Sequence, residues 1–263
     1  MSAFPALLLG GRVVLVTRPA GQAEALCRAV QALGGEALAL PTIAIEALPQ
    51  AAQRVAEAAA AGMEVAVFTS GNAARIAWPL LRAAGATPAY VAAVGEGTAA
   101  ALREAGCAVA VQVPERADSE GLLALPMLEQ VAARRVVIFT GEQGRDVLSA
   151  SLQGRGALVR VTAVYRRALP AAPKAEVVAR LRAGAVHAVT VSSAEGGRNL
   201  YALLPADAGR AVALLPHVVP HPRIAQALRQ EGAVTVLVAP GGDGALAAAL
   251  AGFFAGARAA DGA

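Results

Sequence analysis

Short runs of β-branched and apolar residues alternate with Ala- and Leu-rich stretches along the whole chain. The first run, at 13–17, is typical of a buried strand, and the helical pattern over 21–33 ends at two glycines. Further strands are expected at 65–69, 90–94, 109–113, 136–140, 159–165, 188–192, 217–219 and 234–238. Helices are expected at 72–84, 98–105, 119–132 (with Ser119 as N-cap), 144–153, 176–183, 196–203, 223–231 and 245–255. This alternation favours parallel sheets with helices on both faces.

The chain also contains an internal repeat. Segments 14–17, 67–70 and 92–106 match 137–140, 190–193 and 218–232. The copies run in different orders, because the segment like 14–17 opens one copy and closes the other. The repeat therefore predicts an α/β fold of two Rossmann-like parallel-sheet lobes, one continuous over 44–164 and one discontinuous over 1–40 and 168–263. The crossings, near 41–45 and 161–170, are expected to pair as a two-stranded linker, with a ligand in the cleft between the lobes.

Composition raises the question of a membrane protein, since 56% of residues are hydrophobic and 16% are charged. The apolar runs are shorter than the ~20 residues that a bilayer span needs, so no membrane partner is expected. The N-terminus does not resemble a signal peptide. Cys27 and Cys107 lie far apart and are expected to be buried thiols, which favours a reducing, cytoplasmic location.

The net charge of +4 comes from arginines scattered along the chain, with Lys174 as the single lysine. Aromatic residues make up 3% of the chain, which gives few stacking platforms, and no nucleic-acid partner is expected. A polyanionic small molecule fits better, because the arginine fork binds carboxylates with two hydrogen bonds.

Small hydroxyl side chains and glycines recur where the expected strands end and helices begin. Amide groups at helix N-termini bind anions, so these positions are candidate substrate contacts, while ordinary N-capping is the alternative at each of them. The candidates are Thr17, Thr69, Ser70, Gly95, Thr98, Gly141, Ser192 and Ser193. The sequence has no phosphate-binding loop, and the segment 95–97 is better explained as a tight turn than as a dinucleotide site. His187, His217 and His221 have no metal-ligand spacing, so no metal and no organic cofactor are expected.

Several short segments add a signal through their order and spacing: Val16–Pro19, Pro41–Ile43, Phe68–Ala73, Val94–Leu102, Asp118–Leu123, Thr140–Leu148 and Val164–Arg167. Over residues 12 to about 250 they resemble the uroporphyrinogen-III synthase family. One segment departs from the family pattern, because Ile224 stands where many members have a substrate-contacting threonine. His221 or Arg223 is expected to replace that contact.

The resemblance implies a fold of two α/β lobes joined by a two-stranded ladder, and a cofactor-free cyclisation. The substrate would be hydroxymethylbilane, a linear octacarboxylate tetrapyrrole that closes with inversion of its ring D to uroporphyrinogen III, in haem biosynthesis. Tyr165 is the candidate general acid, since a phenol is protonated at neutral pH and this one lies on a crossing segment. Packing as a hinge residue is the alternative. Added positive charge is expected from Arg18, Arg145, Arg166 and Arg223.

Two other functions remain open on the residues alone: a two-lobe protein that binds a small anion without chemistry, and a nucleotide-dependent α/β enzyme. A monomer is expected, because the sequence has neither a heptad repeat nor an evident self-pairing strand.

Overall fold

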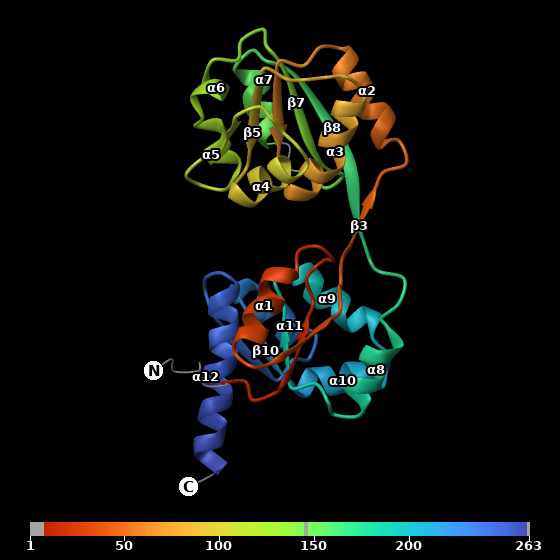
Figure 1. The fold of residues 1–263 in the computed structure, drawn as a ribbon, viewed down its shortest axis with the longest axis vertical. Helices are drawn as coiled ribbons and strands as arrows, with labels where there is room; N and C mark the ends of the chain where they lie inside the picture. Colours follow the sequence, from red (N-terminus) through yellow and green to blue (C-terminus); the bar gives the residue numbers. More distant parts are fainter. Residues whose placement is uncertain (1–7, 145–146, 262–263) are drawn as a thin grey trace. The chain divides into compact units, whose positions relative to one another are not determined.

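The chain folds into two compact units, each built around its own sheet. The computed structural model describes residues 8–144 and 147–261. Lobe 1 takes the described residues up to Ala44 and from Ala168 onward, and lobe 2 is residues 45–167. Each lobe has a parallel sheet covered by helices, and lobe 1 is discontinuous in sequence (Figure 1). This confirms the predicted fold class.

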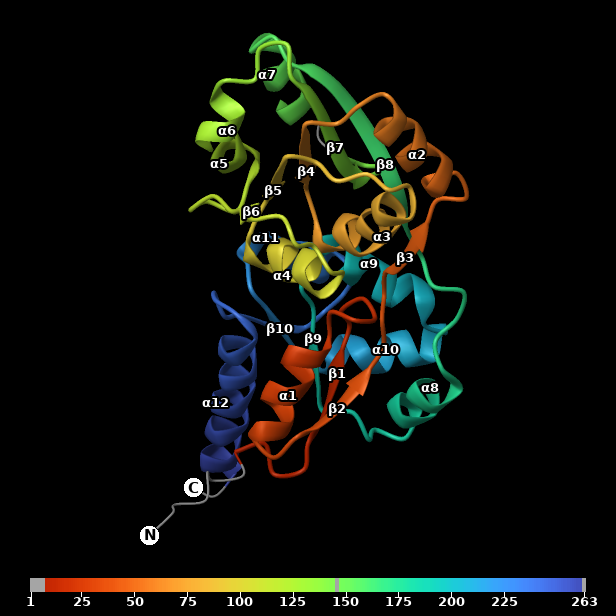
Figure 2. The ribbon, with the colours of Figure 1, turned by 45° about the horizontal axis from the view of Figure 1, so that its top comes forward.

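Lobe 1 has a five-stranded sheet in the order β11-β10-β9-β1-β2. Figure 2 shows β1, β2, β9 and β10 side by side, and the pairs along the sheet are parallel. Its elements are β1 (Val13–Val16), α1 (Glu24–Ala32), β2 (Glu36–Ala39), α8 (Ala175–Arg182), β9 (Ala188–Thr190), α9 (Ala194–Leu203), α10 (Ala206–Leu214), β10 (Pro216–Val219), α11 (Pro222–Gln230), β11 (Thr235–Val238) and α12 (Asp243–Asp261).

Lobe 2 has a six-stranded sheet in the order β3-β8-β7-β4-β5-β6. The pairs from β8 to β6 are parallel. Its elements are β3 (Ala44–Ala47), α2 (Ala51–Ala60), β4 (Val65–Phe68), α3 (Gly71–Ala83), β5 (Tyr90–Ala93), α4 (Glu96–Glu104), β6 (Val111–Gln112), α5 (Ser119–Leu123), α6 (Pro126–Glu129), β7 (Arg135–Gly141), α7 (Val147–Gly154) and β8 (Leu158–Ala168).

The two sheets have the same strand arrangement, which confirms the internal repeat. Read from the edge, β11-β10-β9-β1-β2 corresponds to β6-β5-β4-β7-β8. The matching segments fall on matching strands, since β1 corresponds to β7 and β9 to β4. The order differs in the chain because β1 is the first strand of lobe 1, whereas lobe 2 reaches the equivalent strand, β7, near its end.

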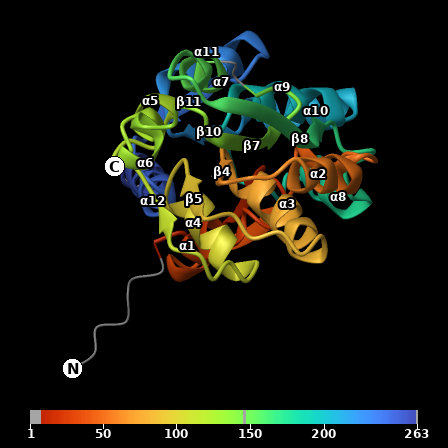
Figure 3. The same ribbon diagram turned by 90° about the horizontal axis from the view of Figure 1, so that it is seen from above.

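Helices cover both faces of each sheet and enclose two cores per lobe. In lobe 1, α8 to α11 pack on one face and α1 with α12 on the other. In lobe 2, α2, α3 and α4 pack on one face, and α5, α6 and α7 on the other; Figure 3 shows α3 and α7 on opposite sides of β7. Apart from the undescribed residues, no helix is long and apolar enough to cross a membrane.

The two segments that cross between the lobes lie side by side, since β3 and β8 are hydrogen-bonded neighbours. Leu48 N donates to Val164 O at 3.0 Å, and the guanidinium of Arg166 lies 2.8 Å from the carboxylate of Glu46. The two crossing segments are thus held together by a backbone hydrogen bond and an ion pair.

The helix expected at 119–132 is wrong in two respects. It is two short helices, because Leu125 precedes Pro126 and takes an extended conformation, as residues before proline prefer. Its N-cap is Asp118, not Ser119: the Asp118 carboxylate accepts from the Gly121 amide at 2.7 Å. The elements β2, α2 and α10 were not predicted, whereas β3 is the first strand of the expected two-stranded linker.

A buried histidine in lobe 1 leads to a prediction about acid stability. His217 is fully buried, and its Nδ1 must carry the hydrogen, because its partner at 2.9 Å is the Leu215 carbonyl; Nε2 then accepts from the Tyr201 hydroxyl at 3.2 Å. Burial lowers the pKa of His217 to about 4. An unfolded histidine titrates near 6.5, so the unfolded state binds more protons between these values. The free energy of unfolding is expected to fall by about 3 kcal/mol as the pH drops through this window.

Urea unfolding at a series of pH values measures this loss. In His217→Asn the part of the pH dependence due to this histidine should disappear, whereas His221→Asn, a change at an exposed residue, should retain it. An unchanged pH dependence in His217→Asn would contradict the assignment.

Candidate functional site

A cavity of about 650 Å³ opens at the carboxyl ends of the lobe 2 strands. The loops after β4, β5 and β7 contribute to it, together with the start of α5 and one face of β8. Ligands of open α/β sheets bind at this edge, because loops and helix N-termini converge there. Its polar lining includes Thr69, Ser70, Asp118, Ser119, Thr140 and Tyr165.

A second cavity in lobe 2, of about 450 Å³, lies at the amino ends of β7 and β8. Arg135 and Arg160 line it, each within 4 Å of a glutamate outside the cavity lining, and most of the other lining residues are apolar. We place the candidate site in the first cavity, because the hydroxyl groups gather at the carboxyl edge.

Tyr165 occupies a fixed position in this cavity. It lies on β8 and is 5% exposed, and its Oη is 3.1 Å from Ser70 Oγ. The register between β7 and β8 slips by one residue here, so that Thr140 faces Ala163 while Gly141 faces Tyr165. A Cβ on Gly141 would lie 2.8 Å from Tyr165 Cζ. The ring therefore needs glycine at position 141.

The hydroxyl side chains of Thr69, Ser70 and Thr140 line the same cavity as the phenol. Ser70 caps α3, with its Oγ accepting from Ala73 N at 3.1 Å. Thr69 Oγ1 lies 3.0 Å from Thr140 Oγ1, which joins the ends of β4 and β7. The chain after Thr140 turns so closely that a Cβ on Gly144 would lie 2.6 Å from Thr140 Oγ1. Local backbone geometry thus fixes the hydroxyl cluster.

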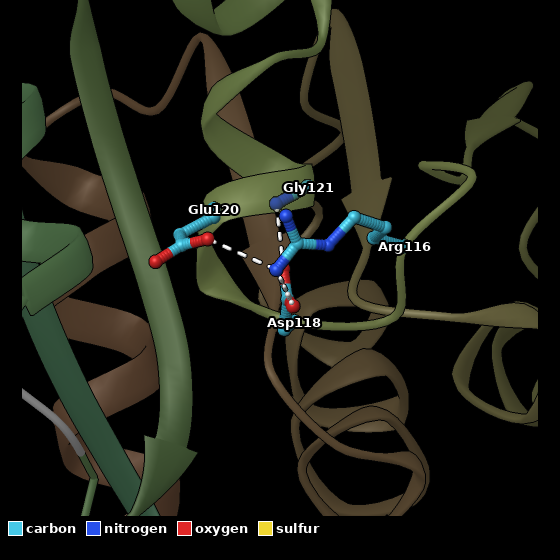
Figure 4. Close-up of polar contacts among 4 residues, drawn as sticks. All are labelled: Arg116, Asp118, Glu120 and Gly121. Carbon is cyan, nitrogen blue, oxygen red and sulfur yellow. Dashed lines mark hydrogen bonds and ion pairs between the residues drawn. The ribbon is translucent and has the colours of Figure 1, made fainter.

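An exposed ion-pair network lies at the start of α5, where Asp118 and Ser119 line the cavity. In Figure 4 the Arg116 guanidinium points at the carboxylates of Asp118 and Glu120, at 2.8 and 2.9 Å. The pKa of Asp118 is lowered by the hydrogen bond from the Gly121 amide and by its bond with Arg116. A Cβ on Gly121 would lie 2.0 Å from the Arg116 carbonyl oxygen, so this wall also requires glycine.

The candidates in lobe 1 lie at the carboxyl ends of its strands, and several of them form hydrogen bonds or ion pairs within the protein. Thr17 Oγ1 donates to Thr190 O at 2.8 Å and is buried. Arg18 donates to Ser192 Oγ at 3.0 Å and forms an ion pair with Asp243. Two others are N-caps: Ser193 accepts from Gly196 N at 2.9 Å and His221 from Arg223 N at 3.1 Å.

Some candidates lie outside the lobe 2 cavity. Gly95 precedes α4 and packs against Ala117, and the side chain of Thr98 is buried. Ile224, which corresponds to Thr98 in the repeat, is buried in the lobe 1 core. Arg145 lies outside the described residues. Thr69, Ser70, Gly141 and Tyr165 come together in the cavity.

Four charged residues were not among the candidates predicted from the sequence. Asp118, Glu142 and Arg167 line the cavity, and Asp243 binds Arg18. The position of Asp243 at the first residue of α12 was a usable signal, since acidic residues favour the first helical turn. Across the described residues, no three His, Cys, Asp or Glu side chains gather as metal ligands.

Comparison with known proteins agrees with this arrangement. The family model described as uroporphyrinogen-III synthase HemD matches residues 24–244. The uroporphyrinogen-III synthase of Escherichia coli K12 is 32% identical over 203 residues, covering 73% of this chain and 80% of the relative. That of Synechococcus elongatus is 26% identical over 206 residues, covering 76% and 77%.

Solved structures give the same fold. A mutant uroporphyrinogen III synthase from the extremely thermophilic bacterium Thermus thermophilus superposes with a TM-score of 0.54 at 23% identity, covering 94% of this chain and 99% of that one. The uroporphyrinogen-III synthetase of Helicobacter pylori 26695 gives 0.56 at 16% identity, covering 91% and 98%. The chain therefore belongs to the uroporphyrinogen-III synthase family and has that family's hydro-lyase activity in tetrapyrrole biosynthesis.

Proposed function

We propose that the lobe 2 cavity binds the hydroxymethyl end of hydroxymethylbilane and that Tyr165 protonates its leaving hydroxyl. The observation behind this proposal is a phenol held at the carboxyl edge of the sheet, within a cluster of hydroxyl groups and hydrogen-bonded to Ser70. A general acid needs a fixed position, and the packing of Tyr165 against Gly141 and its hydrogen bond with Ser70 hold the phenol in one place.

The reaction then runs as follows. The C–O bond of the hydroxymethyl group breaks, its electron pair goes to oxygen, and the Tyr165 proton completes a water molecule. The cation left on the substrate is attacked by the substituted carbon of ring D, which gives a spiro intermediate. Fragmentation and reclosure invert the ring. The proton released as the last pyrrole regains its aromaticity returns to the phenolate, so the net change is loss of one water.

The carboxylates of the substrate are held by many weak contacts. In lobe 2 these are the hydroxyl of Thr69 and the backbone at Gly141, with Arg167 as a cation in the lining. Arg18 and Ser192, at the carboxyl ends of the lobe 1 strands, are candidate carboxylate contacts in that lobe. Binding along the whole length of a flexible chain favours one closure over the other, and positioning of this kind is a large source of rate.

We further propose that the enzyme acts as a monomer in a reducing compartment. Cys27 and Cys107 support a reducing compartment, because both are free thiols and they lie in different lobes. Both are half-buried rather than buried, and burial raises the pKa of each thiol. Raised thiol pKa values reduce reactivity toward oxidants.

The direct test supplies purified protein with hydroxymethylbilane and separates the product isomers after oxidation. The type III isomer is expected, whereas the uncatalysed closure in a buffer control gives the uninverted type I isomer. Formation of type I alone would exclude this function.

A further inference from the structure

We propose that Ser70 is a positioning residue for the acid: its hydroxyl donates a hydrogen bond to the phenolate that Tyr165 becomes when it gives up its proton. The inference rests on the proposed role of Tyr165 and adds to it the group that stabilises the charged state. Contact with a substrate carboxylate, which the sequence predicts for Ser70, is the competing role.

The direction of the Ser70–Tyr165 hydrogen bond carries the argument. With both hydroxyls protonated, either oxygen can donate across the 3.1 Å between them. Once Tyr165 has lost its proton, its oxygen can only accept, so Ser70 must donate. A hydrogen bond to a charged group is stronger than one between neutral groups. The bond therefore strengthens as the proton leaves, and an interaction that strengthens along the reaction lowers the barrier.

The surroundings of Ser70 make it a suitable donor. One lone pair of its Oγ is occupied by the N–H of Ala73, at 3.1 Å. A hydroxyl that accepts one hydrogen bond becomes a better donor for the next, because the bonds polarise one another. Ser70 also sits at the N-terminus of α3, a helix of 13 residues whose dipole favours negative charge nearby.

Packing keeps the two hydroxyls together. Tyr165 is 5% exposed, and its ring lies so close to Gly141 that a Cβ there would meet three side-chain atoms of the tyrosine within 3.1 Å. Ser70 is held by its cap to α3. Neither side chain can turn away without losing buried contacts or a backbone hydrogen bond.

The test compares Ser70→Gly with Ser70→Thr by measuring kcat and KM with hydroxymethylbilane. Glycine removes the hydroxyl but is itself an acceptable N-cap, so the variant should remain folded. We expect kcat to fall about 10- to 100-fold with KM nearly unchanged, because the lost hydrogen bond stabilises the charged acid. Threonine keeps the hydroxyl and should restore most of kcat. Loss of a carboxylate contact would instead raise KM at constant kcat, and that result would overturn the proposal.

A double-mutant cycle with Tyr165→Phe tests the role of Ser70 separately from the role of Tyr165 as the general acid. If Ser70 acts through the phenol, Ser70→Gly should lower kcat in the wild type and have no further effect in Tyr165→Phe. An equal fall in both backgrounds would overturn the role of Ser70 and leave Tyr165 as the acid. Full activity of Tyr165→Phe would overturn the acid itself. Ser193→Gly removes the equivalent serine cap in lobe 1 and serves as the stability control, measured by urea unfolding.

Discussion

Replacing Tyr165 by phenylalanine is expected to lower kcat about 100-fold or more, since general acid catalysis contributes on this scale. Only the hydroxyl is lost: the ring remains packed beside Gly141, and Ser70 keeps its bond with the Ala73 amide. The thermal midpoint should therefore stay close to that of the wild type. Steady-state kinetics with hydroxymethylbilane, together with thermal unfolding, measure both quantities on the same preparation.

Tyr201→Phe is the matched control. Tyr201 is a tyrosine of lobe 1 with a hydrogen-bonded hydroxyl, and its partner is His217. Loss of the Tyr201 hydroxyl should reduce the free energy of unfolding slightly and leave kcat unchanged. If both variants lose activity equally, the effect comes from stability, and if Tyr165→Phe is fully active, the phenol has no part in the chemistry.

Gly121→Ala is expected to destabilise lobe 2 by about 3 kcal/mol, which combines overpacking with the loss of a helix cap. The new Cβ would lie 2.0 Å from the Arg116 carbonyl oxygen, which belongs to the backbone and cannot move aside cheaply. The Asp118–Gly121 hydrogen bond would break, and α5 would leave its place on the cavity wall. Urea unfolding should detect the loss, and kcat should fall with it.

The control for this substitution is Gly97→Ala. Gly97 also lies in the first turn of a helix, but a Cβ there meets nothing within 4 Å. Alanine is a better helix former than glycine, so the free energy of unfolding should stay constant or rise. Equal destabilisation by both substitutions would mean that the contact with Arg116 is not the cause.

The alternating pattern was sufficient to predict the central strands but not every edge. β1 and β4 are runs of β-branched and apolar residues, buried along their whole length, and such runs are distinctive. β2 reads Glu-Ala-Leu-Ala, a helical composition, and is a strand because β1 offers it backbone partners. Tertiary pairing overrides local propensity at such edges.

The sequence was sufficient to predict which strand ends carry the candidate residues, but not what each side chain does there. The sequence placed Thr17 and Ser70 alike, after strands and before helices. In the structure Thr17 is bonded to the backbone of the adjacent strand, whereas Ser70 meets a phenol from a distant part of the chain. The choice depends on which side chain the neighbouring strand presents, and it follows from sheet register rather than from local sequence.

The divided sequence of lobe 1 imposes an order on folding during synthesis. Lobe 2 ends at residue 167, and it can close as soon as that stretch has left the ribosome. β1 is made first, but one of its two neighbours is β9, whose residues 188–190 are made much later. Until then its four apolar residues lack that partner, and exposed strands of this kind are prone to aggregation. β1 is thus a segment of the nascent protein that chaperone binding would protect until β9 has been made.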